Sequence, residues 1–385
     1  MWVFLTALLI ASGSPDAHRV TSPHSVPSSE LYGLTGHGEL LLLPKHQTSP
    51  FHAYIVSISP HSCDNVERIA MTVTDYPLYW PHMREGVKVL QQEPRKIRYS
   101  FKLDVIFSPT IEGVVENPKP HQIVFWDPES NGKFTWDLLP QGNECIMVYD
   151  LYQPKGKQSG FVSLVQHFEK DVADAAELAG GIATARGYAK DRLYKGKAPN
   201  QSAYRETWMR LASSGTVLRT VPRKDKIMRL FAARRISDRP SDVARRIRSR
   251  NTYPQQLDFL SDASQKGQTT QWKVSYFGGR VNFETRSNES GSLQPNDRLL
   301  IRESVVSGDI SQGEWEWRLT PVDGGTEVEL MLDLDLTQGS RILGTLAAQD
   351  PLVRDAALLQ MALKMMGNLI GGEHLSAPSQ VPPNP

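Results

Sequence analysis

The chain has 385 residues, which indicates about two domains, because a single hydrophobic core rarely grows beyond about 250 to 300 residues. Its 43 Lys and Arg residues nearly balance 42 Asp and Glu residues, so the formal net charge is only +1. With 22% charged residues, this composition is typical of a folded globular protein and gives no overall basicity for binding nucleic acid.

An apolar run over residues 2–13 opens the chain and is followed by Ser, Pro, Asp and His. The run is short for a membrane span but has the length of a signal-peptide core, and Ala11-Ser12-Gly13 fits a cleavage site. We therefore predict a signal peptide or anchor over residues 1–19 and an exported protein, periplasmic or secreted. No Lys or Arg precedes the run, so either the true start lies upstream or the segment is an uncleaved anchor. Residues 20–50 have no period and are predicted to be a linker.

A first unit is predicted over residues 51–190. It starts with a strand and a helix over 62–73, which ends before Tyr76-Pro77 because proline disfavours helical geometry in the residue before it. A short helical piece follows. Alternating apolar and polar residues then predict strands, and apolar residues at helical spacing predict a long closing helix. The predicted strands cover 87–92, 96–105, 110–116 and 121–126, with a hairpin over 132–152 and the helix over 161–188.

A second unit over residues 224–372 repeats this order. Residues 191–223 before it are predicted to be a linker with a short helix at 204–211, and residues 373–385 after it a disordered tail. The repeat has a strand over 226–233, a helix over 241–250, strands over 271–277, 280–286 and 298–306, a hairpin over 313–336 and a closing helix from Asp350-Pro351 to Gly371-Gly372.

Three pairs of landmarks support the duplication: Tyr76 with Tyr253, Trp136 with Trp317 and Asp150 with Asp333. We expect the two units to superpose with their hairpins in equivalent positions. We also expect separate sheets, not one continuous sheet.

Each unit resembles the START-like (helix-grip) superfamily in the order of its elements. That order is a strand, a helix followed by Tyr-Pro, a run of antiparallel strands and a long C-terminal helix. This family includes polyketide cyclases and coenzyme-Q-binding proteins. The resemblance implies an α+β fold of two tandem helix-grip domains, each a curved antiparallel sheet wrapped around a long C-terminal helix, with a deep cavity for a hydrophobic ligand. In the second copy no aromatic residue equivalent to Trp80 follows Tyr253-Pro254, which implies a different pocket mouth.

Large side chains on the strand faces assigned inward are the candidate ligand-binding residues, because they can supply apolar contact. The hydroxyl groups of Tyr99, Tyr149 and Tyr276 could orient a ligand carbonyl, or could be satisfied by the backbone. The first unit contributes Tyr76, Trp80, Tyr99, Phe101, Phe125, Trp136, Met147 and Tyr149, and the second contributes Tyr253, Trp272, Tyr276, Phe283, Trp317 and Leu330.

The sequence has no His-Glu-x-x-His, no Gly-x-Ser-x-Gly and no phosphate-binding loop. We predict no catalytic residue, metal or cofactor, and a function in binding or transporting a hydrophobic small molecule or lipid. One alternative is a polyketide cyclase/dehydratase-type lyase that acts by shaping a reactive chain within one cavity. Another is a non-catalytic interaction scaffold with filled cores.

The stretch between residues 223 and 250 is rich in basic residues. It is either a solvated helix face or a patch for anionic phospholipid headgroups, and the lack of interleaved aromatic residues argues against nucleic acid. The patch would comprise Arg234, Arg235, Arg245, Arg246, Arg248 and Arg250. The two cysteines, Cys63 and Cys145, are interpreted as small buried hydrophobic residues, with a disulfide as the alternative.

Overall fold

The computed structural model describes residues 22–35, 38–44, 51–79, 83, 86–102, 110–126, 128, 132–153, 173–188, 201–223, 226–276, 279–294, 297–310, 312–334 and 351–370. The predictions of a signal peptide over 1–19 and a disordered tail over 373–385 lie outside these residues. Among the described residues, no helix combines the length and apolarity needed to cross a membrane.

Each half of the chain contributes eight strands to the described structure. Those of the first half are β1 Leu40–Pro44, β2 Phe51–Ser59, β3 Val87–Glu93, β4 Lys96–Lys102, β5 Thr110–Lys119, β6 Gln122–Trp126, β7 Lys133–Gln141 and β8 Glu144–Gln153. Those of the second are β9 Gly215–Arg223, β10 Lys226–Ile236, β11 Leu260–Lys266, β12 Thr269–Tyr276, β13 Gly279–Ser290, β14 Leu299–Gly308, β15 Gly313–Val322 and β16 Gly325–Leu334. All predicted strands are present in some form, and β1, β9 and β11 were not predicted.

Helices also repeat between the halves. The first half has η1 Pro23–Ser25, α1 Ser28–Thr35, α2 Cys63–Ala70, η2 Val73–Asp75, α3 Tyr76–Tyr79 and α5 Ala173–Tyr188. The second has η4 Gln201–Tyr204, α6 Arg205–Ser214, α7 Pro240–Arg248, η5 Arg250–Gln255, α9 Pro351–Lys364 and the π-helical turn η7 Met365–Leu369. The closing helices α5 and α9 are the predicted ones, although residues 161–172 of the first prediction lie outside the described residues.

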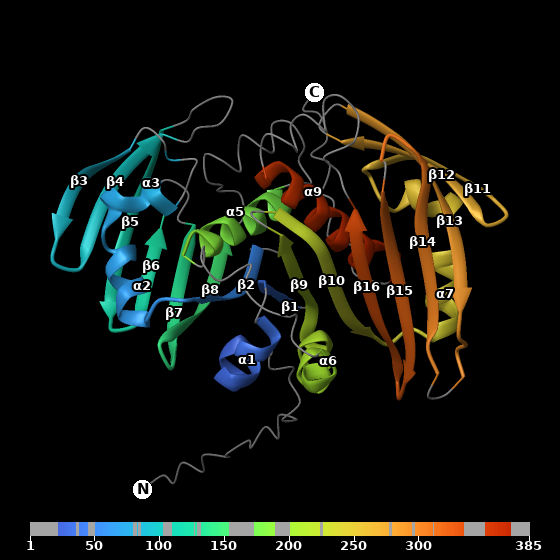
Figure 1. Cartoon of the computed structure of the whole chain (residues 1–385), viewed down its shortest axis with the longest axis horizontal. Coiled ribbons are helices and arrows are strands. Elements are labelled where there is room, and N and C mark those ends of the chain that lie inside the picture. The colour runs from blue at the N-terminus through green and yellow to red at the C-terminus, as the bar shows by residue number, and fades with distance from the viewer. Residues whose placement is uncertain are drawn as a thin grey trace, which may run out of the picture.

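The strands form one 16-stranded antiparallel sheet in the order β11-β12-β13-β14-β15-β16-β10-β9-β1-β2-β8-β7-β6-β5-β4-β3 (Figure 1). Read from the middle outward, the two halves have the same strand order, so the α+β class and the two tandem helix-grip units are confirmed. The expectation of two separate sheets is wrong, because β1 pairs with β9 and joins the halves.

Both predicted linkers are wrong where the structure describes them. Residues 20–50 contain α1 and β1, and residues 191–223 contain α6 and β9, with the predicted short helix falling within η4 and α6. In each half a helix and a central strand therefore precede the elements predicted for the unit. Each repeat begins earlier than its sequence pattern indicated.

The turns of the two long hairpins set equivalent positions in the halves. Gly142 and Gly324 have positive φ angles of 61° and 75°, which glycine adopts without a steric cost. Gln141 pairs with Glu144 in one hairpin and Val322 with Gly325 in the other.

Counting strand residues from these turns aligns Trp136 with Trp317, as predicted, and both are fully buried. The same count aligns Asp150 with Met331. The predicted equivalence of Asp150 and Asp333 is therefore wrong.

Two apolar clusters cover opposite faces of the central strands. The larger contains residues of the sheet with α5 and α9, and the smaller contains residues of α1, α6 and the other face of β1, β2, β8 and β9 (Figure 1). Leu40 and Leu42 belong to the smaller cluster and Leu41 to the larger. The central strand β1 is therefore apolar on both faces.

A buried ionic cluster joins the two units where α5 packs against α9. Arg186 on α5 donates to both oxygens of Glu39, at 2.9 and 3.1 Å, and to Asp355 on α9 at 2.7 Å. Thr220 on β9 also donates to Glu39. Burial opposes the charge on Arg186, but the two carboxylates raise its pKa above the ordinary value. Such a cluster ties the halves in one arrangement, because separating them would leave charges unpaired in the interior.

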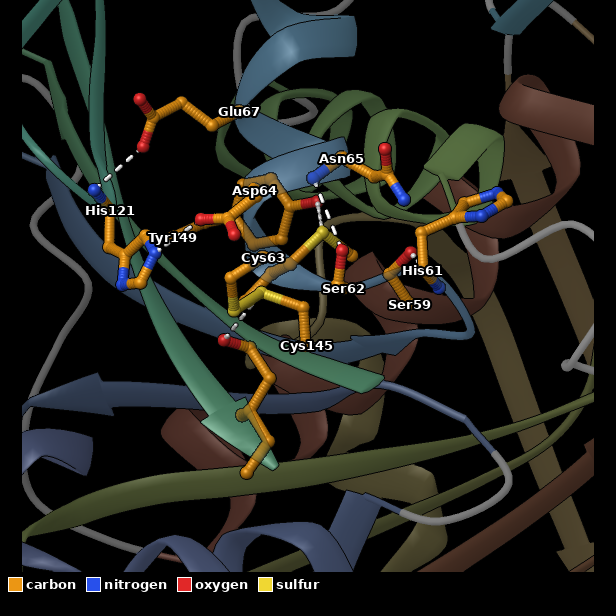
Figure 2. The surroundings of a disulfide bond; sticks show 12 residues. Ser59, His61, Ser62, Cys63, Asp64, Asn65, Glu67, His121, Cys145 and Tyr149 are labelled. Atoms are coloured by element: carbon orange, nitrogen blue, oxygen red, sulfur yellow. Dashed lines mark hydrogen bonds and ion pairs between the residues drawn. A yellow bond between two sulfur atoms is a disulfide. The ribbon is translucent and has the colours of Figure 1, made fainter. Parts of the chain in front are cut away.

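A disulfide links Cys63, at the start of α2, to Cys145 in β8 (Figure 2). The interpretation of the two cysteines as small buried hydrophobic residues was therefore wrong about their chemistry, although both are buried. Ser62 caps α2 by accepting from the backbone of Asn65, and the start of the helix also contacts the β5–β6 turn, where Asp64 lies 2.9 Å from His121. The disulfide and this contact fix α2 across the sheet.

Candidate functional site

An aromatic cluster lines the inward face of the first unit. The ring centroids of Phe125 and Trp136 lie 4.5 Å apart, those of Trp136 and Tyr149 lie 4.7 Å apart, and those of Tyr76 and Tyr99 lie 5.4 Å apart. These distances are typical of packed aromatic pairs. Phe101 stacks on Tyr99, and Met147 is fully buried in the same core. The described residues among the first unit's predicted set thus lie together, while Trp80 lies outside the described residues.

Two of the predicted tyrosines are held by the backbone. Tyr76 donates from its hydroxyl to the carbonyl of Ala70 at 2.6 Å, and Tyr253 donates to the carbonyl of Ile247 at 2.7 Å. In both units the acceptor lies six residues upstream, at or near the end of the preceding helix, so Tyr76 and Tyr253 are equivalent. Their hydroxyls anchor that helix to the turn after it.

Tyr99 and Tyr149 differ in what their hydroxyls contact. Tyr149 donates to the sulfur of Met147 at 3.4 Å. The hydroxyl of Tyr99 has no hydrogen-bond partner among the described residues, although the side chain is only 6% exposed. Burial raises the pKa of both tyrosines above the ordinary value, so both remain protonated at neutral pH. Tyr99 thus offers a free donor on an apolar wall.

The second unit carries a similar cluster, built around tryptophan. Trp272 lies 5.6 Å from Tyr253 and 5.7 Å from Trp315, and Phe283 packs on both tryptophans. Trp315 was not in the predicted set, although it lies two residues before Trp317 on β15 and therefore points to the same face of the sheet. The side chain of Tyr276 lies outside the described part of the structure.

Trp317 and Leu330 pair directly across β15 and β16. In the first unit the corresponding pair is Trp136 with Tyr149. The second unit therefore has leucine where the first has a phenol.

A buried polar network beside this cluster was missed by the sequence interpretation. Glu303 on β14 accepts from Arg250 at 2.5 Å and from Thr285 at 2.7 Å, and Thr285 accepts from the indole nitrogen of Trp272 at 2.9 Å. Ser287 accepts from the same arginine at 2.7 Å. Glu303 and Arg250 are 2% and 3% exposed. The alternation of Leu299, Ile301 and Glu303 along one strand face was the signal that could have revealed an inward carboxylate.

The six arginines of the predicted headgroup patch do not form one exposed surface. Arg234 and Arg250 are buried, and Arg250 belongs to the network with Glu303. The other four donate to acceptors on the protein itself: Arg235 to the carbonyl of Asp323, Arg245 to Asp242, Arg246 to Asp238 and Arg248 to Glu289. The prediction of a single patch of these six residues is therefore wrong.

Among the described residues, no group of three or more His, Cys, Asp or Glu side chains is placed to hold a metal ion. The candidate site therefore consists of two aromatic walls, one with a free tyrosine hydroxyl and one with a buried carboxylate and arginine.

Residues 236–350 match the family model described as polyketide cyclase / dehydrase and lipid transport. This match covers most of the second unit and confirms its resemblance to START-like proteins; the first unit shares the strand order of the second. No curated protein matches the sequence of this chain.

Two similar solved structures illustrate the comparison with known folds. One is the di-domain ARO/CYC BexL from the BE-7585A biosynthetic pathway, with 13% identity over 82% of this chain and 95% of that chain and a TM-score of 0.28. Another is the STAR-related lipid transfer protein from Xanthomonas axonopodis, with 15% identity over 40% of this chain and 94% of that chain and a TM-score of 0.31.

Proposed function

We propose that this protein binds a hydrophobic small molecule or lipid against the inward face of its sheet, beside the closing helices α5 and α9. The aromatic walls supply large apolar surfaces, and each buried aromatic ring contributes contact that water cannot replace. The family description matched by the second unit covers both lipid transport and cyclisation, and binding of an apolar substrate is common to both.

The observation that carries this proposal is the free hydroxyl of Tyr99. The hydroxyl oxygen is not fully enclosed by the protein, so a ligand carbonyl can accept its hydrogen bond without displacing a protein group. Tyr76 in the same cluster is already bonded to the backbone. The two neighbouring tyrosines therefore make a matched pair, one expected to contact ligand and one expected to support the fold.

The test is a titration with decylubiquinone, which carries ring carbonyls, and with dodecylbenzene, which carries none, each followed by displacement of Nile red. Tyr99→Phe should weaken decylubiquinone binding about tenfold, the equivalent of one hydrogen bond, and leave dodecylbenzene unchanged. Tyr76→Phe should lower stability but leave both affinities unchanged. Failure of the wild-type protein to bind either molecule saturably would refute the proposal and favour the scaffold with filled cores.

A cyclase/dehydratase-type lyase is the second candidate, and the pair Arg250–Glu303 favours it. A carboxylate on the inward face can accept a proton from a carbon next to a carbonyl, the step that begins an aldol-type ring closure. Glu303→Gln should then reduce turnover of a poly-β-ketone precursor on the order of a hundredfold while binding persists. Glu289→Gln is the matched control, because Glu289 also accepts from an arginine but lies at the surface. Equal turnover in all three proteins would exclude this role for Glu303.

We also propose that the protein is exported to an oxidising compartment. The apolar run over residues 2–13 supports this, and so does the disulfide, because such bonds are rare in reducing cytoplasm. Intact-mass measurement of protein from its own source should give a mature N-terminus near residue 14 with two fewer hydrogens than the dithiol form. Abundant cytoplasmic protein that retains Met1 and free thiols would contradict it.

A further inference from the structure

A cavity of about 190 Å³ lies on the sheet face opposite α5 and α9, and Leu330 of the second wall is the one described wall residue that also borders it. Helices α1 and α6 both lie over this face, α6 against β9 and β10 and α1 against β2, β7 and β8 (Figure 1). Its walls come from three separate parts of the chain, and include Gly33 of α1, Trp208 of α6, Phe231 of β10 and Met331 of β16. The cavity therefore exists only because the two segments predicted as linkers fold onto the sheet.

Arg219 is the unusual residue of this cavity. It lies on β9, only 8% exposed, with its guanidinium 4.9 Å from the ring centroid of Phe231. Among the described residues no carboxylate pairs with it. Burial lowers its pKa to about 10. A buried cation without a counterion is costly, and proteins normally provide a partner.

Two other buried arginines show that normal arrangement in this same chain. Arg186 donates to Glu39 and Asp355, and Arg250 donates to Glu303. Arg219 is buried to a similar degree as these two arginines, but its guanidinium borders a cavity where theirs contact carboxylates. The position of its missing counterion is therefore the cavity itself.

Further arginines line the cavity and keep it positive, with four arginines against two glutamates. Arg205 donates to Glu329 at 3.2 Å, and Arg318 donates to Glu316 at 2.7 Å, so these two are held in fixed positions. The guanidinium of Arg298, which is exposed, has no carboxylate partner among the described residues. An entering anion would thus meet Arg298 and Arg219 with their donors unoccupied.

The remaining walls are apolar or aromatic, with Tyr204, Trp208, Phe231 and Met331 beside the arginines. The volume is below the range of about 300 to 1,000 Å³ that holds drug-sized ligands. We propose that this pocket binds a compact molecule with one carboxylate or phosphate group and a small apolar portion, held by Arg219. Planar guanidinium groups suit both anions, because each presents two oxygens to the donor fork.

This site is separate from the proposed function, since it lies across the sheet and shares no arginine with the aromatic walls. The full chain would be titrated by calorimetry with benzoate, with phenyl phosphate and with neutral benzyl alcohol. We expect saturable binding of at least one anion and at least tenfold weaker binding of benzyl alcohol. The stronger of the two anions identifies the acidic group.

Arg219→Gln should weaken the preferred anion at least tenfold and leave the thermal midpoint equal or higher, because it removes an unpaired buried charge. Arg298→Gln, at an exposed position where folding is not at risk, should weaken it about threefold. Arg245→Gln, on an exposed arginine of α7, is the matched control and should bind as the wild type does. Absence of saturable anion binding to the wild type, or equal affinities in the Arg219 and Arg245 variants, would overturn the proposal.

Discussion

Removing the disulfide should destabilise the first unit by an amount set by the loop that it closes. Cys63 and Cys145 are separated by 82 residues in sequence. In the chain-entropy description, closing a loop of that length lowers the entropy of the unfolded chain by the equivalent of about 4.5 kcal/mol at 25 °C. Both side chains are buried, so alanine at both positions avoids leaving a reactive thiol or a buried hydroxyl. The double variant Cys63→Ala/Cys145→Ala should therefore lose about 4 kcal/mol of unfolding free energy.

The assay is urea unfolding followed by circular dichroism, with and without dithiothreitol. The reductant should shift the wild-type midpoint to that of the double variant and leave the variant unchanged. The two joined units could unfold in separate steps, so the transition that moves is the one assigned to the first unit. A loss of less than about 1 kcal/mol, or an equal effect of reductant on both proteins, would refute the loop-entropy reasoning.

Three further perturbations test other parts of the fold. Arg186→Met leaves two buried carboxylates without their cation and should cost about 3 to 5 kcal/mol of unfolding free energy; an unchanged urea midpoint would contradict the ionic junction between the units. Tyr76→Phe and Tyr253→Phe should each cost about 1 to 2 kcal/mol by calorimetry, because each leaves a buried carbonyl without its donor; equal losses would support equivalent roles. Burial disfavours the charge on Glu316, but hydrogen bonds from Arg318 and Arg302 hold its pKa below the ordinary value. The charged carboxylate therefore stabilises the folded state above about pH 4.3, and this contribution is lost as pH falls through the folded pKa. Glu316→Gln should flatten the acid limb of stability against pH, and an unchanged limb would contradict the assignment.

The hairpins were predictable because each carries a local signal. Trp136 and Trp317 alternate with polar residues on strands that end in glycine turns, and half-buried strands produce this period of two. Tyr76 and Tyr253 were recognisable as equivalents because the proline after each ends the preceding helix. These features depend on neighbours in sequence, so the repeated order could be read without a structure.

The central strands were missed for a physical reason. Strand β1 consists of four leucines and a proline, and it is covered on both faces, by α1 on one side and the larger core on the other. A strand buried on both faces shows no alternation, so its sequence resembled an apolar stretch within a linker. Strand β9, the partner of β1 across the junction, was missed as well, because it lay in the segment interpreted as the second linker.

The sequence predicted which aromatic residues face inward, but it did not predict the polar contacts beside them. The aromatic residues were expected on the inward face, and those described lie there. Arg250 was assigned to a surface patch because sequence shows clustering of charge but not partners, and its partner Glu303 lies 53 residues away. Arg219 carried no signal at all, since an arginine on an unrecognised strand cannot be assigned to a face. Long-range pairing is thus what the sequence alone left open.

The most direct test of the central claim is native mass spectrometry of the full protein purified from its own source, followed by release and identification of any bound molecule. If the inward aromatic walls bind a hydrophobic ligand, the folded protein should carry additional mass from a lipid, quinone or polyketide, and Trp136→Ala should reduce the occupied fraction. Detection of the protein only at the mass of its own chain under native conditions, without bound lipid even after incubation with a lipid extract, would contradict hydrophobic ligand binding.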